Sequence, residues 1–197
     1  FNTLNSINTL VGSSKEQARK VITQLSDIFR YALDSHNDQM VKLVHEIDFI
    51  DNYMRIQQVR FGERLRFVKQ VDFSCLSILV PPMILQPLVE NSVKYGIAPK
   101  DEGGTIILTV KRVDYMIFFE VKDDGLGSKA KKVMDSYSGS GVGIKNTDQR
   151  LRSIFGPGAG LRIHSSEYGY SVSFFIPAEQ RSLPPVDFDN EELNKTG

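Results

Sequence analysis

The sequence predicts an α+β fold in which an N-terminal antiparallel helical hairpin precedes a two-layer α/β sandwich. Apolar residues recur at helical spacing through residues 1–61, whereas later segments are rich in β-branched and aromatic residues and alternate with glycine turns. The 197 residues suffice for one good domain or for a small domain plus a helical appendage. We expect the dimerisation-type hairpin in residues 1–61, the sandwich in 62–180, and a disordered tail or linker in 181–197, which is rich in Pro, Asp and Glu.

We expect two helices in the first sixty or so residues. The first is expected from residue 1 to about residue 34, and the second from about Leu43 to Arg60, with a polar turn over residues 34–40 between them. An apolar stripe this long favours a homodimer with a four-helix core, although the hairpin packing on its own following domain remains the alternative. The expected stripe of the first helix includes Val21, Leu25, Ile28, Phe29 and Leu33, and that of the second includes Ile47, Ile50, Met54 and Gln57.

The strands of the sandwich are predicted from runs in which apolar and polar residues alternate, separated by residues typical of turns. A strand is expected over Leu65–Phe73, and a helix within Pro81–Gly96, opened by its two prolines. Two hairpins and one further helix follow, the helix stopped by Gly156-Pro157-Gly158. Their expected elements are the strands Thr105–Val113 and Met116–Lys122 around Asp114-Tyr115, the helix Ile144–Phe155, and the strands Leu161–Ser165 and Tyr170–Ile176 around Tyr168-Gly169.

Composition narrows the classes of partner. Apolar residues make up 41% of the chain and charged residues 24%, which is typical of a globular protein. A formal net charge of zero gives no electrostatic reason to expect nucleic acid as a partner. Cys75 has no cysteine to pair with, which suits a reducing compartment, and its neighbours Phe73 and Leu76 predict a buried thiol. The most apolar run, Leu76–Val89, is too short to span a membrane, and because the chain begins with Phe we expect an excised piece of a longer protein.

Polar side chains gather at the end of the apolar helix within Pro81–Gly96. Asn91, Lys94 and Tyr95 fall at i, i+3 and i+4, so a helix presents them on one face beside Glu90. A neutral Asn oxygen suits Mg²⁺ and a Lys suits phosphate. This pattern predicts a site for a metal-bound polyphosphate, and the alternative for Asn91 is an ordinary hydrogen bond at a helix end. Glu90 acts either as a base or orienting group, or it simply faces solvent.

Two glycine motifs follow this helix. Asp123-Asp124-Gly125-Leu126-Gly127 comes directly after a β-rich run, where a carboxylate can accept from an amine while the backbone approaches a flat ring. Gly139, Gly141 and Gly143 then open a helix that contains Lys145, and free N–H groups at a helix start suit phosphates. Each motif alone is explained as well by a turn, with Asp123 as a capping residue. Residues 128–140 read as a polar lid that nucleotide would order.

The order of these motifs resembles the N, G1 and G2 boxes of the ATP-binding superfamily that includes gyrase, Hsp90, mismatch-repair ATPases and histidine kinases. The resemblance implies the Bergerat (HATPase) fold and the cofactors ATP and Mg²⁺, with Asn91 as a Mg²⁺ ligand and Asp123 as the acceptor of the adenine amine. It implies ATP contacts from a set of residues that spans the three boxes. This set is Asn91, Lys94, Tyr95, Asp123, Gly125, Gly127, Gly139, Gly141, Gly143 and Lys145.

One sequence position distinguishes relatives that hydrolyse ATP from relatives that transfer its phosphoryl group to a protein side chain. Relatives that hydrolyse ATP place a Glu four residues before the magnesium Asn, where this chain has Pro87, which has no acid–base chemistry. The pattern Asn-x-x-Lys-Tyr instead resembles histidine kinases, so we expect phosphoryl transfer to a protein side chain.

The N-terminal segment is similar to the LytS/YehU-type sensor histidine kinases. The matching residues are Phe1-Asn2-Thr3-Leu4-Asn5, Arg30-Tyr31, Val41, Leu43, Glu46, Tyr53, Gln57, Arg60-Phe61, Leu85 to Asn91, Lys145-Asn146 and Arg150-Leu151. This resemblance covers about residues 1 to 177 and implies a homodimeric, ATP-dependent kinase, with Glu90 in a catalytic role. Its implied partner is a response regulator, often of the LytTR type, and the parent would be an inner-membrane protein with this region in the cytoplasm.

Three departures from the family pattern bear on activity. The family's phosphoacceptor His lies three residues before Phe1, so it is absent from this chain, and we expect no autophosphorylation. Tyr95 stands where His is usual, and Asp124 where Asn is common. His45, followed by Glu46, resembles the acceptor of other kinase families, but it falls at a variable position of this one.

Two rival functions remain beside the kinase. The first is a non-catalytic dimerisation module that senses nucleotide, in which the ATP site changes helix packing and transfers no phosphate. The second is a serine kinase of the anti-sigma type, and the helical hairpin argues against it because such kinases lack one.

Overall fold

The computed structural model describes residues 14–34, 38–130 and 142–179 of the chain. Its helices are α2 (Lys15–Asp34), α3 (Leu43–Phe61), α4 (Gln86–Asn91), continued by a π-helix (Ser92–Ile97), and α6 (Val142–Phe155). Its strands are β1 (Val41–Lys42), β2 (Leu65–Val71), β3 (Leu79–Val80), β4 (Gly104–Val113), β5 (Met116–Asp123), β6 (Arg162–Ser166) and β7 (Gly169–Pro177).

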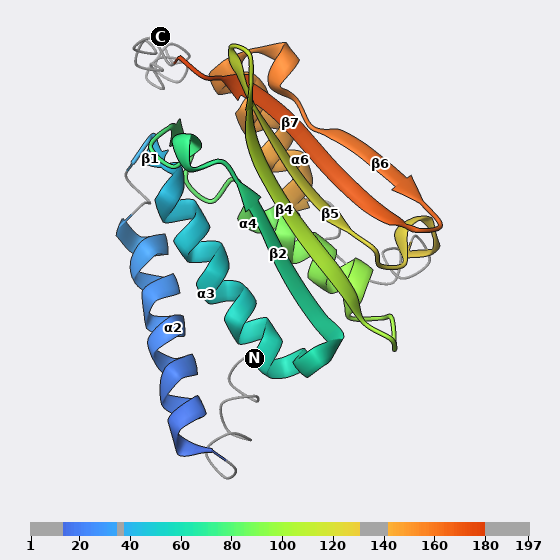
Figure 1. Cartoon of the computed structure of the whole chain (residues 1–197). Helices are drawn as coiled ribbons and strands as arrows, with labels where there is room; N and C mark the ends of the chain where they lie inside the picture. Colours follow the sequence, from blue (N-terminus) through green and yellow to red (C-terminus); the bar gives the residue numbers. More distant parts are fainter. Residues whose placement is uncertain (1–13, 35–37, 131–141, 180–197) are drawn as a thin grey trace, which may run out of the picture.

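These elements form two layers (Figure 1). One layer is a five-stranded sheet in the order β2-β4-β5-β7-β6, and α4 and α6 cover one of its faces. Strand β2 runs parallel to β4, while the other neighbouring strands are antiparallel. The predicted α+β class, with helices ahead of a two-layer sandwich, is therefore confirmed.

Every second residue of the central strands is buried, so one face of the sheet packs against the helices. The hairpin expected between the fourth and fifth strands forms around Asp114, whose φ of 53° provides the tight turn. The last hairpin turns one residue earlier than predicted, because Ser166 already pairs with Gly169. The residues of this buried face are Ile106, Leu108, Val110, Ile117, Phe119, Val121, Val172, Phe174 and Ile176.

The apolar stretch Pro81–Gly96 differs from the prediction at its start. The two prolines do not open a helix, and the α-helix begins only at Gln86, with Pro87 in its first turn. Met83 has a φ of 57°, which is left-handed and incompatible with a continuous helix. The N–H groups of residues 83–85 bond to the Glu46 carboxylate of α3 instead of a helical ladder.

Helix α3 matches its prediction to within one residue and belongs to the central core. Ile47, Ile50 and Met54 are buried among side chains of the sheet and of α4. A short pairing of β1 with β3, which joins Val41 to Val80, ties the entry of α3 to the segment before α4. The division of the chain at residue 61 stays a prediction, and α3 contributes to the same core as the residues that follow it.

Helix α2 covers the described part of the first predicted helix. Of its expected stripe, Val21 is buried, whereas Phe29 and Leu33 are 59% and 74% exposed. Four sets of expectations lie outside the described residues: residues 1–13, residues 35–37 of the 34–40 turn, residues 131–140 of the 128–140 lid, and the 181–197 tail.

The strand predicted over Leu65–Phe73 ends at Val71. Asp72 leaves the sheet, although its carboxylate still accepts from the Arg112 N–H at 3.1 Å, and Phe73 becomes 88% exposed. Cys75 is buried as expected. Of the two apolar neighbours on which that expectation rested, Leu76 packs against the core and Phe73 does not.

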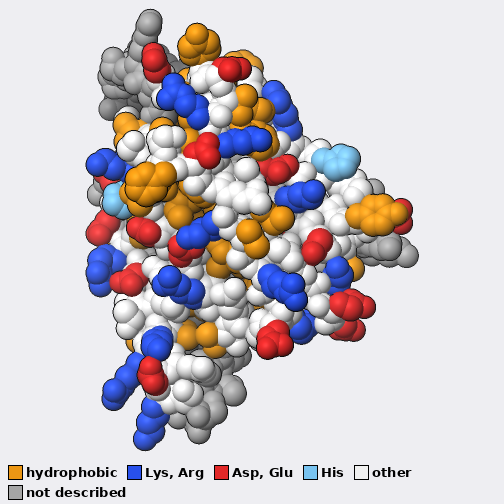
Figure 2. Space-filling view, viewed as in Figure 1, with side chains coloured by type: hydrophobic (Ala, Val, Ile, Leu, Met, Phe, Trp, Pro, Cys, Tyr) orange, Lys and Arg blue, Asp and Glu red, His pale blue; other side chains and the backbone are white. Residues whose placement is uncertain are grey.

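The visible surface mixes both signs of charge. In Figure 2, Lys and Arg side chains lie among Asp and Glu over the face shown, in keeping with the formal net charge of zero. Among the described helices, none combines the length and apolar character that a membrane crossing requires.

Candidate functional site

A polar cavity of about 140 Å³ lies where the end of α4 meets the start of α6. Glu90, Asn91, Lys94 and Tyr95 line it from α4 and the π-helix. The three side chains predicted to share a helix face therefore do line one cavity, although a π-helix carries two of them. Single π-helical turns are rare and frequently occur at functional sites. Pro87, Gly143 and Ile144 complete the lining, and sequence reasoning had not placed Pro87 or Ile144 there.

The side chains of this wall differ in exposure. Tyr95 is only 6% exposed, whereas the Lys94 side chain reaches outward, its Nζ 4.9 Å from the centre of the Tyr95 ring. A cation over an aromatic face is held in place by the ring quadrupole. Lys94 is thus directed along the cavity wall, where its charge can meet an anion.

Glu90 is half-buried and held in one orientation. Its Oε1 accepts a hydrogen bond of 2.7 Å from Gln86 Nε2, one helical turn earlier. Burial raises the pKa of Tyr53 on α3 well above its usual range, the Glu90 carboxylate adds to the rise, and Arg60 opposes it. Glu90 therefore lies between the cavity and the side chains of α3, which does not fit the purely solvent-facing alternative.

Asp123 ends β5 and is 2% exposed. Its Oδ1 accepts from the Gly125 N–H at 3.0 Å. Burial raises the pKa of Asp123, while the nearby Ser92 hydroxyl and the Gly125 amide oppose the rise. Within the described residues, neither Asp123 Oδ2 nor Ser92 Oγ completes a hydrogen bond. Two buried polar atoms without partners are costly unless a ligand or water completes their hydrogen bonds, so this pair is a candidate position for a polar ligand.

The glycines after Asp123 let two backbones meet. A Cβ on Gly125 would overlap the backbone of Gly96, and the Leu126 N–H bonds to the Gly96 carbonyl at 3.2 Å. A Cβ on Gly96 would lie 2.6 Å from Asp123 Oδ1. The strand end and the π-helix are thus in direct backbone contact, which fixes Asp123 relative to Asn91.

Other sequence-predicted residues are placed less centrally. Gly127 has a φ of 52° and turns the chain away beside β6 and β7, so its role in the fold is a turn. Lys145 is exposed on α6 and is not among the residues that line the cavity. Gly139 and Gly141 lie outside the described residues, while Gly143 sits in the first turn of α6.

Two residues of this region were given no role by the sequence. Asp124 accepts from the Thr105 N–H at 2.7 Å through its side chain, and its carbonyl accepts from Lys100 Nζ at 2.7 Å, so it anchors the strand end. Ser92 follows Asn91 directly, and a hydroxyl within an apolar helix could have signalled a buried polar partner.

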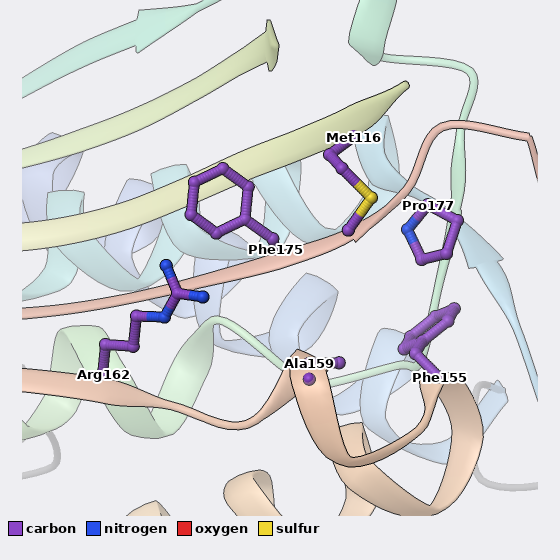
Figure 3. Close-up of a pocket in the computed structure, with 7 residues that line it drawn as sticks. Met116, Phe155, Ala159, Arg162, Phe175 and Pro177 are labelled. Atoms are coloured by element: carbon purple, nitrogen blue, oxygen red, sulfur yellow. The ribbon is translucent and has the colours of Figure 1, made fainter. Parts of the chain in front are cut away.

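A larger cavity of about 340 Å³ lies near the other end of α6 and differs in character. Figure 3 shows Met116, Phe155, Phe175 and Pro177 around it, with Arg162 at one side. The Arg162 guanidinium is 5.0 Å from the centre of the Phe175 ring. This cavity is apolar and contains none of the sequence-predicted residues, so the smaller polar cavity is the candidate site.

Metal binding at the candidate site would rely on few protein atoms. In the part of the chain that the structure describes, no group of three or more His, Cys, Asp and Glu side chains could hold a metal ion. An Asn oxygen beside a Lys fits a Mg²⁺ that takes most of its ligands from phosphates and water. The donors of the cavity therefore fit a nucleotide-borne Mg²⁺ rather than a metal site made of protein alone.

Curated proteins are similar to this chain over most of its length. The chain is 31% identical over 185 residues to Sensor protein LytS of Staphylococcus haemolyticus, covering 90% of this chain and 32% of that protein. It is 34% identical over 179 residues to Sensor histidine kinase YesM of Bacillus subtilis, covering 90% of this chain and 31% of that protein. The chain thus spans about a third of the length of the curated relatives it matches.

Solved structures share the fold. The histidine kinase domain of the blue-light activated histidine kinase EL346 from Erythrobacter litoralis superposes with a TM-score of 0.54 at 16% identity. The match covers 85% of this chain and 82% of that one. At this identity the likeness shows the fold alone.

Two family models match separate parts of the chain. One, described as Histidine kinase, matches residues 1–65. The other, described as Histidine kinase-, DNA gyrase B-, and HSP90-like ATPase, matches residues 82–180, about half of the chain. The sequence resemblance is thereby confirmed, and the chain belongs to the histidine kinase-, DNA gyrase B- and HSP90-like ATPase family, within its histidine kinases.

Proposed function

We propose that this chain is the catalytic region of a two-component sensor histidine kinase. It binds ATP with Mg²⁺, and the parent protein transfers the γ-phosphoryl group to a histidine and then to an aspartate of a response regulator. The observation that carries this proposal is the polar cavity, where Glu90, Asn91 and Lys94 meet the start of α6 one backbone contact away from the buried Asp123.

The adenine end of the nucleotide belongs at Asp123. Its buried Oδ2 needs a donor, and the exocyclic amine of adenine is one. Ser92 Oγ beside it can donate to or accept from a ring nitrogen or a bridging water. Because Gly96 has no Cβ, no side-chain atom of that residue presses on Asp123 Oδ1. Because the donor must be an amine, a guanine in the same pose would oppose its carbonyl to the carboxylate.

The phosphate end belongs in the polar cavity. The Asn91 oxygen would hold Mg²⁺, and Lys94 together with the free N–H groups of the first turn of α6 would face the phosphates. Mg²⁺ there would neutralise charge on the β- and γ-phosphates. Positioning and charge stabilisation supply most of the catalysis in such transfers, so the protein needs little covalent chemistry of its own.

Glu90 is the residue we assign to the reacting end. Gln86 fixes its carboxylate beside the cavity, where it can orient or deprotonate an incoming imidazole. Pro87, one turn before Asn91, lines the same cavity at the position where ATP-hydrolysing relatives carry their water-activating Glu. Its inert ring supports transfer to a side chain over transfer to water.

Assembly and location complete the proposal. The exposed apolar side chains of α2 support a homodimer through the N-terminal helices. A response regulator of the LytTR type is proposed from the family alone, as is a membrane-anchored parent with this region on the cytoplasmic side.

Titration calorimetry with Mg²⁺ and ATP or ADP tests the site. We expect affinity in the micromolar range or weaker, loss of the magnesium dependence in Asn91→Ala, and loss of adenine selectivity over guanine in Asp123→Ala. The matched control is Asp101→Ala, an exposed carboxylate whose side chain is not part of the cavity. Wild-type behaviour in both site variants would refute the assignment.

Transfer is tested with radiolabelled ATP on three proteins. They are this chain, the chain extended upstream through the family's Pro-His motif, and that extension with its His changed to Gln. We expect acid-labile label on the second alone, since His36, His45 and His164 are the histidines of this chain and none is the family acceptor. Label on this chain that disappears in His45→Gln would instead make His45 the acceptor. Nucleotide binding without label on the extended chain would favour the non-catalytic sensing module.

A further inference from the structure

One carboxylate outside the cavity is fully buried, and both of its oxygens accept hydrogen bonds. Glu46 of α3 is 0% exposed. Its Oε1 accepts from the Met83 N–H at 2.6 Å and from the Tyr31 hydroxyl at 2.5 Å. Its Oε2 accepts from the N–H groups of Ile84 at 2.9 Å and Leu85 at 3.2 Å. A single side chain of α3 therefore holds three consecutive backbone amides of the segment before α4 and one phenol of α2.

The segment depends on Glu46 for its conformation. Met83 is left-handed, and Ile84 and Leu85 are buried at 1% and 0% exposure, so their amides have no access to water. Buried N–H groups without acceptors are strongly unfavourable, and Glu46 supplies the acceptors for all three. Leu85 leads directly into α4, which carries Glu90 and Asn91.

The same segment is also held by α6. Arg150 Nη1 donates to the Pro82 carbonyl at 2.5 Å. Arg150 is half-buried, and its charge acts on both Glu46 and Tyr31. Helix α6 begins beside the polar cavity, where Gly143 and Ile144 line it. Residues 82–85 are thus bonded to both α3 and α6, and α4 and α6, the two helices that line the cavity, both reach this segment.

Tyr31 connects the segment to α2. Its ring packs against Phe49 of α3 with centres 5.3 Å apart, and its hydroxyl points at the Glu46 carboxylate. Burial raises the pKa of Tyr31 far above its usual range, and the Glu46 charge adds to this rise. The phenol is therefore protonated at neutral pH and is a donor to Glu46.

We propose that Glu46 is a positioning residue that couples helix α2 to the nucleotide cavity through Tyr31 on one side and residues 82–85 with Arg150 on the other. The inference rests on the proposed nucleotide site. A nucleotide that moves or rigidifies α4 and α6 acts on residues 82–85, and Glu46 passes the change to Tyr31 and α2. By linkage, a change in α2 alters nucleotide affinity by the same factor.

Hydrogen exchange on the whole chain, with and without Mg-ADP, tests the coupling directly. In the wild type we expect bound nucleotide to slow exchange of α2 amides by about fivefold, the lower end of typical coupling factors. Tyr31→Phe keeps the ring packing and removes only the hydroxyl, so the nucleotide effect on α2 should fall below about twofold while the protein stays folded. Tyr115→Phe, an 83% exposed tyrosine in the β4–β5 turn, is the matched control and should behave as wild type.

A second measurement separates positioning from general stability. Glu46→Gln replaces an acceptor by an amide donor, and we expect nucleotide affinity to fall by about fivefold or more, with faster exchange of residues 83–85. Arg150→Lys keeps the charge but changes the geometry at Pro82, and a smaller loss is expected. If Glu46→Gln does not fold, Tyr31→Phe still decides the matter.

The outcomes are distinct. Nucleotide that binds the wild type without changing α2 exchange overturns the coupling and leaves the nucleotide site intact. An undiminished effect in Tyr31→Phe overturns the proposed route. A wild-type chain that fails to bind any nucleotide refutes the proposed function and the coupling with it.

Discussion

The two helices of the N-terminal hairpin both carry apolar residues at helical spacing but have very different surroundings. Helix α3 buries seven residues, among them Leu43 and Ile50 at 0% exposure, and lies between α2 and the sheet. Helix α2 buries two, Ala18 and Val21. Its Ile22, Phe29 and Leu33 are exposed at 48%, 59% and 74%.

The difference teaches that a helical period identifies an apolar face but not the surface that covers it. Burying one large apolar side chain contributes about 1.5–3 kcal/mol, so a face left open on one chain is normally closed by another. On α3 the partner is the chain's own sheet, whereas on α2 we propose a second copy of the chain. Each prediction below changes one helix and uses the other as its reference.

Truncation should show the largest difference between the two helices in their importance for folding. Removing residues 1–34 deletes α2 and leaves the core of α3, so the remaining chain should fold. Removing residues 1–61 also strips Leu43, Ile50 and Met54 from the core and Glu46 from residues 83–85, so we expect aggregation or a molten state. Near-UV circular dichroism and thermal melting distinguish these outcomes. A cooperative melt of the shorter chain would contradict the central role of α3.

Single core substitutions should repeat the contrast at smaller scale. Ile50→Ala leaves a cavity at a fully buried site and should lower the free energy of unfolding by about 3 kcal/mol. The matched change in α2, Leu33→Ala at 74% exposure, should stay within about 0.5 kcal/mol. Urea denaturation at a protein concentration that keeps the chain monomeric measures both. Equal losses at the two positions would show that α2 is covered within the monomer.

A charge on the open face of α2 tests the proposed second copy. Phe29→Glu should weaken self-association at least about tenfold, because the interface would have to bury a carboxylate without a partner. The unfolding free energy of the monomer should change little, since Phe29 is exposed there. Analytical ultracentrifugation over a concentration series gives the dissociation constants, with Phe73→Glu, an exposed aromatic far along the chain from α2, as the control. A wild-type chain that stays monomeric, or a variant that dimerises as well as wild type, would refute this interface.

Substitutions in ion pairs should change the free energy of unfolding least. Asp51 of α3 pairs with Lys69 of β2, and Asp51→Asn should cost at most about 1 kcal/mol because the pair is partly exposed. Glu16 and Lys20 of α2 form an exposed pair at 2.8 Å, and Glu16→Gln should leave global stability unchanged. A larger effect from Glu16 than from Asp51 in urea denaturation would contradict the ranking.

The Glu16 pair also has a defined pH dependence. The hydrogen bond and charge of Lys20 hold the pKa of Glu16 below its usual value. Because the pKa of Glu16 is lowered in the folded state, the contribution of the Glu16–Lys20 pair to the helicity of α2 is present at neutral pH. It is lost as pH falls through that lowered pKa. Circular dichroism of the Glu16→Gln variant should therefore lack the small wild-type change in α2 helicity on acidification.

The sequence alone determined the features that depend on neighbours a few residues apart. Helix α3, the strands β4 to β7 and the stop after α6 followed from periodicity and turn residues, because side chains at i+2, i+3 or i+4 share a face. The grouping of Asn91, Lys94 and Tyr95 followed in the same way. The family resemblance added Asp123, which local spacing could not distinguish from a turn residue.

Only the tertiary structure decided the features that depend on distant contacts. The start of α4 moved to Gln86 because a carboxylate some forty residues earlier accepts the amides of residues 83–85. Phe73 turned outward because the chain leaves the sheet at Asp72. The parallel pairing of β2 with β4 and the buried Ser92 beside Asp123 likewise join segments that no local window contains. A buried polar group is satisfied by whichever partner the fold brings to it, and this is a property of three-dimensional packing rather than of spacing along the chain.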